Sequence, residues 1–184
     1  IIDHSEGTDA CVEALNKRAG GEKRKMPTNF LKRLIFLVLN SNCVAFMGRF
    51  FHQLLGTAMG TPMAPSYANI FMGKVETEML KQFERETGLT PSIWYRFLDD
   101  IFFVWPQGKE KLDYFIQFMQ DFSKTKNMKT NLMFTFEMVK SVPFLDVMVS
   151  IGEKGEVVTQ LYSKPTDAHL YLRSDSCHPN ACTK

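Results

Sequence analysis

Two adjacent carboxylates, Asp99 and Asp100, interrupt the apolar stretch WYRFLDDIFFVW at residues 94–105. Two carboxylates about 4 Å apart repel by about 4 kcal/mol at an effective dielectric of ~20, so the pair is costly if nothing neutralises it. A divalent cation reverses that sign, and hard oxygen ligands suit Mg²⁺ or Mn²⁺. The chemistry this favours is in-line phosphoryl transfer at a two-metal site. The competing interpretation is a plain turn, since Asp also favours turns.

A second segment, GTAMGTPMAPSYANIFM, precedes the aspartates in the chain and is rich in small residues. Pro62 and Pro65 fix the backbone where this loop becomes a helix. Small residues let a backbone approach another large body closely, so the loop is a candidate platform for a base pair. The competing interpretation is a tight helix start against a neighbouring strand.

The elements that must position these segments follow from hydrophobic periodicity and turn residues. We expect helices over residues 5–18, 29–40 and 108–124, and one that starts near Pro65 and ends at Gly88. We expect strands on both sides of Met47–Arg49, on both sides of Asp99 and Asp100, over 132–139, and on both sides of Glu153–Gly155. Helices mixed with antiparallel hairpins predict an α+β fold.

Composition limits the class of protein. The chain has 184 residues, is 45% hydrophobic and carries a net charge of +2, so it can bury a core and is no strong polycation. One local stretch is basic, and it is either a solvated loop or a surface that faces phosphates. Its residues are Lys17, Arg18, Lys23, Arg24, Lys25, Lys32 and Arg33.

The four cysteines are too few and too scattered for a disulfide framework, so we expect free thiols in a reducing, intracellular compartment. Cys177, His178 and Cys182 supply only three ligands from one short segment, and no second pair completes a zinc spacing. The apolar run at residues 34–39 is too short to span a bilayer, so we expect no membrane segment.

Taken together, the motifs resemble those of reverse transcriptases. MGTPMAPSYAN resembles the reverse-transcriptase segment QGSPLSPxLAN, RFLDD resembles the polymerase motif aromatic-x-Asp-Asp, and PFLDVMVS looks like the later FLGF-type primer grip. The sequences of these motifs are most similar to those of Penelope-like retroelement reverse transcriptases, which are relatives of telomerase. The resemblance runs through nearly the whole chain, with its motifs in the right order.

The resemblance implies a right-hand polymerase palm, partial, with an antiparallel sheet and packed helices. Residues 1–163 would form this palm with its primer-grip hairpin, and 164–184 would begin the thumb or a connection. The implied partners are an RNA template, a DNA primer and deoxynucleoside triphosphates, and the nucleus is a compatible compartment.

The resemblance also assigns roles to residues. Asp99 and Asp100 would be catalytic and would bind Mg²⁺ or Mn²⁺. The nucleotide and template side would comprise Met59, Gly60, Thr61, Pro62, Met63, Pro65, Asn69 and Phe97. The primer grip would comprise Phe144, Leu145 and Asp146, and the lysine near the triphosphate would be Lys126, Lys129 or Lys140.

Two departures from the family pattern matter. Met59 stands where many reverse transcriptases have Gln, which removes a polar group because a thioether is only a weak acceptor. The resemblance also implies another catalytic carboxylate, upstream of Ile1; Asp3 is its only early rival and sits on the wrong side of the motif. We therefore expect these residues alone to be inactive. The alternatives are a catalytically dead nucleic-acid-binding module and another palm enzyme, such as an RNA-templated RNA polymerase.

Overall fold

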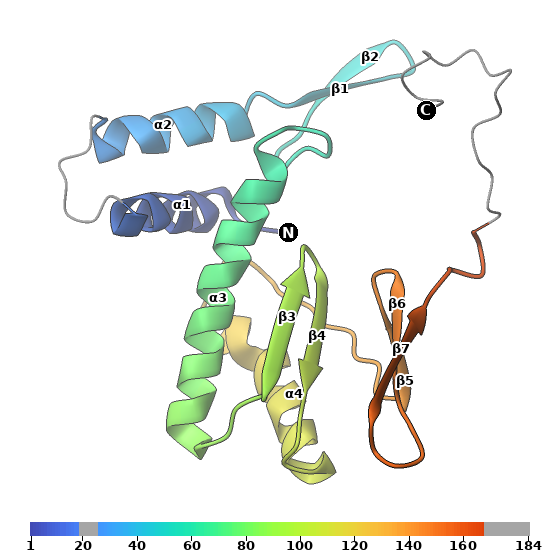
Figure 1. Ribbon diagram of the computed structural model, residues 1–184. Coiled ribbons are helices and arrows are strands. Elements are labelled where there is room, and N and C mark those ends of the chain that lie inside the picture. The colour runs from blue at the N-terminus through green and yellow to red at the C-terminus, as the bar shows by residue number, and fades with distance from the viewer. Residues whose placement is uncertain (19–25, 168–184) are drawn as a thin grey trace, which may run out of the picture. The chain divides into compact units, whose positions relative to one another are not determined.

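The computed structural model describes residues 1–18 and 26–167, and its helices and strands alternate irregularly along the chain (Figure 1). They are α1 (His4–Arg18), α2 (Thr28–Leu39), β1 (Cys43–Phe46), β2 (Arg49–His52), α3 (Ala64–Thr87), β3 (Ile93–Phe97), β4 (Asp100–Val104), α4 (Lys109–Thr125), β5 (Ser141–Phe144), β6 (Val147–Ile151) and β7 (Val157–Leu161). The strands pair antiparallel as β1-β2, β3-β4 and β5-β6-β7, which confirms the α+β class.

The chain divides into two compact units, Ile1–Thr135 and Phe136–Lys184. The first unit contains the four helices and the two hairpins β1-β2 and β3-β4, and the second contains the sheet β5-β6-β7. The proposed division into a palm over 1–163 and a thumb start over 164–184 stays a prediction, and residues 168–184 lie outside the described part.

Helix α1 begins at a side-chain cap. The carboxylate Oδ1 of Asp3 accepts the backbone N–H groups of Ser5 and Glu6 at 2.9 and 3.1 Å. This satisfies donors that have no partner within the first turn of a helix, and it makes Asp3 the cap of α1. The carboxylate of Glu6 in turn accepts the backbone N–H groups of Lys129 and Thr130 at 2.7 and 2.9 Å.

Helix α3 begins and ends as its sequence predicts. Pro65 lies in the first turn, and Gly88 closes the helix in the left-handed conformation at φ +70°. Phe71, Val75 and Met79 form a buried stripe, which continues to Phe83.

Aromatic side chains form the core between α3, α4 and the β3-β4 hairpin. The Phe83 ring lies 4.8 and 5.0 Å from the centroids of Phe115 and Phe118, and Trp105 stacks on Phe115 at 4.9 Å. From β3, Trp94 reaches Phe115 edge-on at 6.3 Å. Buried aromatic pairs contribute beyond the area that they bury, so this cluster fixes the hairpin against the helices.

A smaller cluster joins α1, α2 and α3 through Cys11, Leu39 and Tyr67. At its edge Glu13 forms ion pairs with Lys17 and Lys74 at 2.8 and 2.7 Å, and the hydrogen bonds from these lysines lower the pKa of Glu13 to about 2. The cluster and the ion pairs hold the first turns of α3 beside α1, as Figure 1 shows for the two helices.

Two glycines in helices should respond in opposite ways to alanine. A Cβ at Gly7 would overlap the phenol ring of Tyr67, which is buried, whereas a Cβ at Gly73 would meet only Arg96 Nη2 at 4.0 Å. We expect Gly7→Ala to destabilise the chain by about 1–3 kcal/mol through overpacking. Gly73→Ala should stabilise it by about 0.5–1 kcal/mol, because alanine loses less entropy in a helix. Urea unfolding measures both free energies. Equal effects of the two changes would contradict the close contact between Gly7 and the Tyr67 ring.

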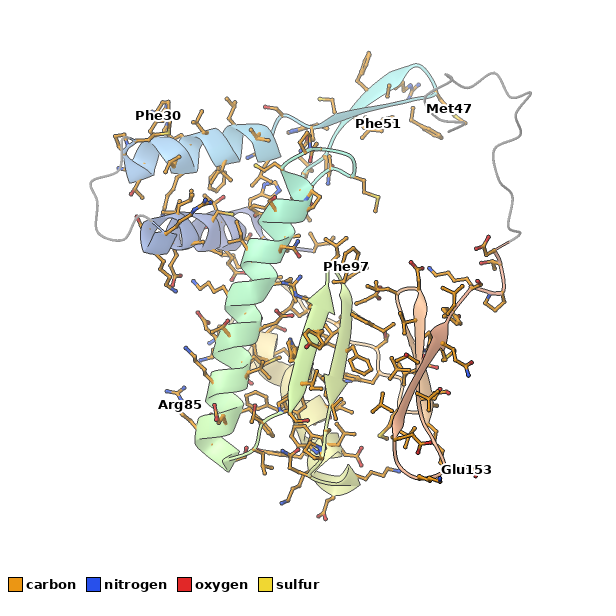
Figure 2. All side chains as sticks on the ribbon, in the orientation of Figure 1. Phe30, Met47, Phe51, Arg85, Phe97 and Glu153 are labelled. Atoms are coloured by element: carbon orange, nitrogen blue, oxygen red, sulfur yellow. The ribbon has the colours of Figure 1, made fainter. Side chains whose placement is uncertain are left out.

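The apolar face of α2 remains exposed in the part of the chain that the structure describes. Phe30 is 50% exposed and Leu37 63%, and the neighbouring hairpin exposes Phe50 and Phe51. Figure 2 shows the labelled side chains of Phe30, Met47 and Phe51 on α2 and on the β1-β2 hairpin. Exposed apolar surface of this extent marks a binding surface more often than a solvated one.

Two strand predictions were wrong. Residues 132–139 form no strand, although their apolar residues alternate in part. Residues 141–161 form three strands in place of two, because Leu145 and Asp146 make a turn that divides the first of the expected strands.

Other predictions concern residues that the structure describes only in part. Cys11 and Cys43 are free thiols, as expected, whereas Cys177, His178 and Cys182 lie outside the described residues. No helix within residues 1–18 and 26–167 has both the length and the apolar character of a bilayer span. In the basic stretch Lys17 and Lys32 form ion pairs with Glu13 and Asp9, and residues 23–25 are not described.

Candidate functional site

The aspartates lie at the tip of the β3-β4 hairpin, as expected. Phe97 pairs with Asp100 at the end of the ladder, and Leu98 and Asp99 form the two-residue turn between them. Leu98 adopts φ +54°, a left-handed conformation that strains a residue with a Cβ. Asp99 and Asp100 are exposed, so both carboxylates are accessible at a tip whose strands are fixed by the aromatic core.

The same turn occurs a second time, in the second unit. Phe144 pairs with Val147, Leu145 adopts φ +56°, and Asp146 takes the place that Asp99 has in the first turn. The backbone N–H of Tyr162 donates to the carbonyl oxygen of Asp146 at 2.8 Å. The residues predicted for the primer grip therefore form a hairpin tip, and their role in holding a primer stays a prediction.

Arg96 joins the aspartate hairpin to helix α3. Its Nη1 donates to Asn69 Oδ1 at 2.7 Å and to the carbonyl oxygen of Leu98 at 2.9 Å. Its Nε donates to Glu76 Oε1 at 2.6 Å, and its Nη2 donates to the carbonyl oxygen of Asn69 at 3.2 Å. One guanidinium therefore contacts the turn and two places on the helix.

The ion pair between Arg96 and Glu76 is largely removed from water, with side chains only 10% and 12% exposed. Burial raises the pKa of the Glu76 carboxyl, and the charge of Arg96 and its hydrogen bond oppose that rise. Removing one member of such a pair leaves an uncompensated charge, so the two residues hold each other in place.

The loop before α3 is held at several points. Thr61 Oγ1 donates to the carbonyl oxygen of Ala58 at 3.0 Å, and a ring nitrogen of His4 lies 2.8 Å from the carbonyl oxygen of Gly56. Gly60 adopts φ +86°, a conformation that favours glycine, so the backbone here depends on that residue. Met59 is fully exposed.

The residues predicted for the nucleotide and template side have different surroundings. Asn69 contacts Arg96 and so lies beside the aspartate hairpin, whereas Met63 packs against the cluster of Cys11, Leu39 and Tyr67. Phe97 is half-exposed and faces Asp100 across the ladder.

The structure does not distinguish among the three candidate lysines for the triphosphate. Lys126 caps α4 and lies over the Phe122 ring at 5.7 Å, Lys129 donates its backbone N–H to Glu6, and Lys140 lies in the second unit.

Arg96 and Glu76 were not among the residues predicted from the sequence. The available signal was an arginine on the inward face of a strand, because Trp94 and Arg96 alternate with the exposed residues of β3.

The donor set at the hairpin tip fits Mg²⁺ or Mn²⁺. Among the described residues no three His, Cys, Asp or Glu side chains gather closely enough to hold a metal ion. Mg²⁺, however, is usually bound by one or two carboxylates together with substrate phosphates, which a substrate-loaded site would provide. Asp99 and Asp100 are the residues that would hold it, because their hard oxygen donors are adjacent and accessible.

Comparison with known families agrees with this chemistry. A family model described as reverse transcriptase (RNA-dependent DNA polymerase) matches residues 21–149, which is more than half of the chain and includes both the small-residue loop and the aspartate turn. No curated protein and no solved structure matches the chain significantly.

Proposed function

This chain belongs to the reverse transcriptase (RNA-dependent DNA polymerase) family, and from that premise we propose that it carries the aspartate-bearing part of the palm of a retroelement polymerase. The polymerase would transfer nucleotides to a primer 3′-hydroxyl on an RNA template. The observation that carries the proposal is the exposed Asp99 and Asp100 tip, fixed by Arg96 to the helix that follows the small-residue loop.

Each group of residues has a role in this proposal. Asp99 and Asp100 would hold Mg²⁺ or Mn²⁺, which when bound stabilises negative charge on the leaving pyrophosphate and activates the attacking hydroxyl. The Gly60 to Pro65 loop would support the templating base pair, since its small and proline residues give a close, rigid surface. Phe97 would lie beside the reacting end, because it pairs with Asp100.

Two finer parts of the proposal come from the resemblance. The wording of the motifs is most similar to Penelope-like elements, and the catalytic set of that family includes a carboxylate that would lie upstream of Ile1 in the same polypeptide. Asp3 does not take that role in this proposal, because its carboxylate caps α1.

Primer extension tests the proposal. We expect the 184-residue chain to leave a DNA primer on an RNA template unextended, and the same chain with its natural upstream residues to extend it when Mg²⁺ is present. Robust extension by the chain alone would show that the catalytic set is complete within these residues. Failure of the longer polypeptide, with its fold verified, would overturn the proposed polymerase activity.

A catalytically dead nucleic-acid-binding module is the alternative. It is favoured by the basic stretch, in which Arg18 and Arg33 are exposed and would face phosphates. In that case the longer polypeptide would bind a primer–template without extending it. The binding constant would fall with salt concentration, because each phosphate contact releases counterions.

A further inference from the structure

Arg96 does more than neutralise a buried carboxylate. Its guanidinium makes four hydrogen bonds, of 2.6 to 3.2 Å, to Glu76, to Asn69 twice and to the carbonyl oxygen of Leu98. Glu76 alone would satisfy its charge. The bonds to Asn69 and Leu98 go to neutral oxygens, so they serve geometry and not charge balance.

The positions of these oxygens explain why the residue is an arginine. The carbonyl of Leu98 belongs to the strained turn that carries Asp99, and Asn69 lies near the start of α3, close to the end of the small-residue loop. A guanidinium has five donors in a rigid plane and can contact several acceptors at once in fixed directions. A lysine ammonium is a compact charge on a flexible stem, and it cannot reproduce this geometry.

We propose that Arg96 is a positioning residue: it fixes the Leu98 turn, and with it Asp99 and Asp100, at a set place relative to the start of α3, using the Asn69 side chain as its anchor. This inference rests on the proposed function, in which the two carboxylates hold a divalent cation. Asn69, predicted to face nucleotide or template, thereby acts on the metal site even when no nucleotide is bound.

The direction of the change in metal affinity distinguishes a positioning role of Arg96 from a purely electrostatic one. Arg96 is a cation close to the site of a cation, so removing its charge alone should raise metal affinity by Coulomb's law. Loss of a residue that orients metal ligands lowers affinity instead, typically by about 10–100-fold. Arg96→Lys keeps the positive charge and removes the planar set of guanidinium donors. It therefore tests the positioning role alone.

The experiment measures Mn²⁺ binding to the 184-residue chain without nucleotide, by water-proton relaxation. We expect Arg96→Lys to weaken Mn²⁺ binding about tenfold. Asn69→Ala, which removes one anchor from an exposed position, should weaken it a few-fold. Arg85→Lys is the matched control: this arginine is exposed near the end of α3 (Figure 2), and its replacement should leave Mn²⁺ binding unchanged.

Asp99→Asn separates the failure of this inference from the failure of the proposed function. If Asp99→Asn weakens Mn²⁺ binding while Arg96→Lys and Asn69→Ala bind as the parent chain does, the positioning role is wrong and the metal site stands. If Asp99→Asn has no effect, the metal site itself is wrong. Should Arg96→Lys fail to fold by circular dichroism, Asn69→Ala decides the question, and unchanged binding in that variant overturns the inference.

Discussion

Asp99→Ala is expected to lower primer extension roughly a thousandfold in the longer polypeptide of the proposed function. The reason is that a carboxylate at the tip of the β3-β4 hairpin would hold the cation that stabilises charge in the transition state. That stabilisation amounts to several kcal/mol, and every 1.36 kcal/mol is about a factor of ten in rate. The measurement is single-nucleotide incorporation into a labelled primer under single-turnover conditions.

Asp113→Ala is the matched control, because Asp113 is an exposed aspartate on α4 and does not belong to the β3-β4 hairpin. Extension by that variant should equal that of the parent polypeptide. Primer–template binding should survive Asp99→Ala, since phosphate contacts and not the carboxylate supply most of the affinity. Full extension activity in Asp99→Ala would remove Asp99 from the catalytic set.

Phe83→Ala is expected to destabilise the first unit by about 3–5 kcal/mol. The Phe83 ring is completely buried and contacts the rings of Phe115 and Phe118 on α4, so its removal leaves a cavity between two helices. A loss of this size is a large fraction of the stability of an ordinary domain. Urea unfolding followed by tryptophan fluorescence is the measurement.

Both tryptophans of the chain, Trp94 and Trp105, contact Phe115 in this core, so the fluorescence reports on the unit in which the cavity lies. Phe30→Ala is the control, because Phe30 is half-exposed on α2 and its loss should change the free energy of unfolding by no more than about 0.5 kcal/mol. Equal destabilisation by the two changes would show that the aromatic cluster is not the main core.

Local chemistry in the sequence was enough to predict the elements that carry the site. Pro65 and Gly88 mark the ends of α3, and the interrupted strand pattern around Asp99 predicts a hairpin, because both signals depend only on backbone preferences. Residues 132–139 show the limit of that approach. Partial alternation is compatible with a strand, but a strand forms only where a partner strand is available.

Contacts between elements could not be read from the sequence. Periodicity does not tell what covers the apolar face of a helix, and on α2 the side chains of Phe30 and Leu37 stay exposed. Met63 was assigned to the nucleotide side by its motif, and the motif does not indicate that it also packs against a core cluster. The partnership of Arg96 with Glu76 joins residues far apart in the chain, and neither one alone carries a signal for it.

Helix α3 sets a limit on how the chain length can vary. It has 24 residues and spans about 36 Å, and it carries in order the end of the loop, the two partners of Arg96, and Phe83. Asn69 and Glu76 are two helical turns apart and so share one face. Inserting or deleting one residue between them would rotate one partner by about 100° away from the hairpin. Substitutions on the opposite face of α3 leave the spacing of Asn69 and Glu76 unchanged. A change in the number of residues between them would instead remove one of the contacts by which Arg96 holds the aspartate hairpin to the helix that follows the loop.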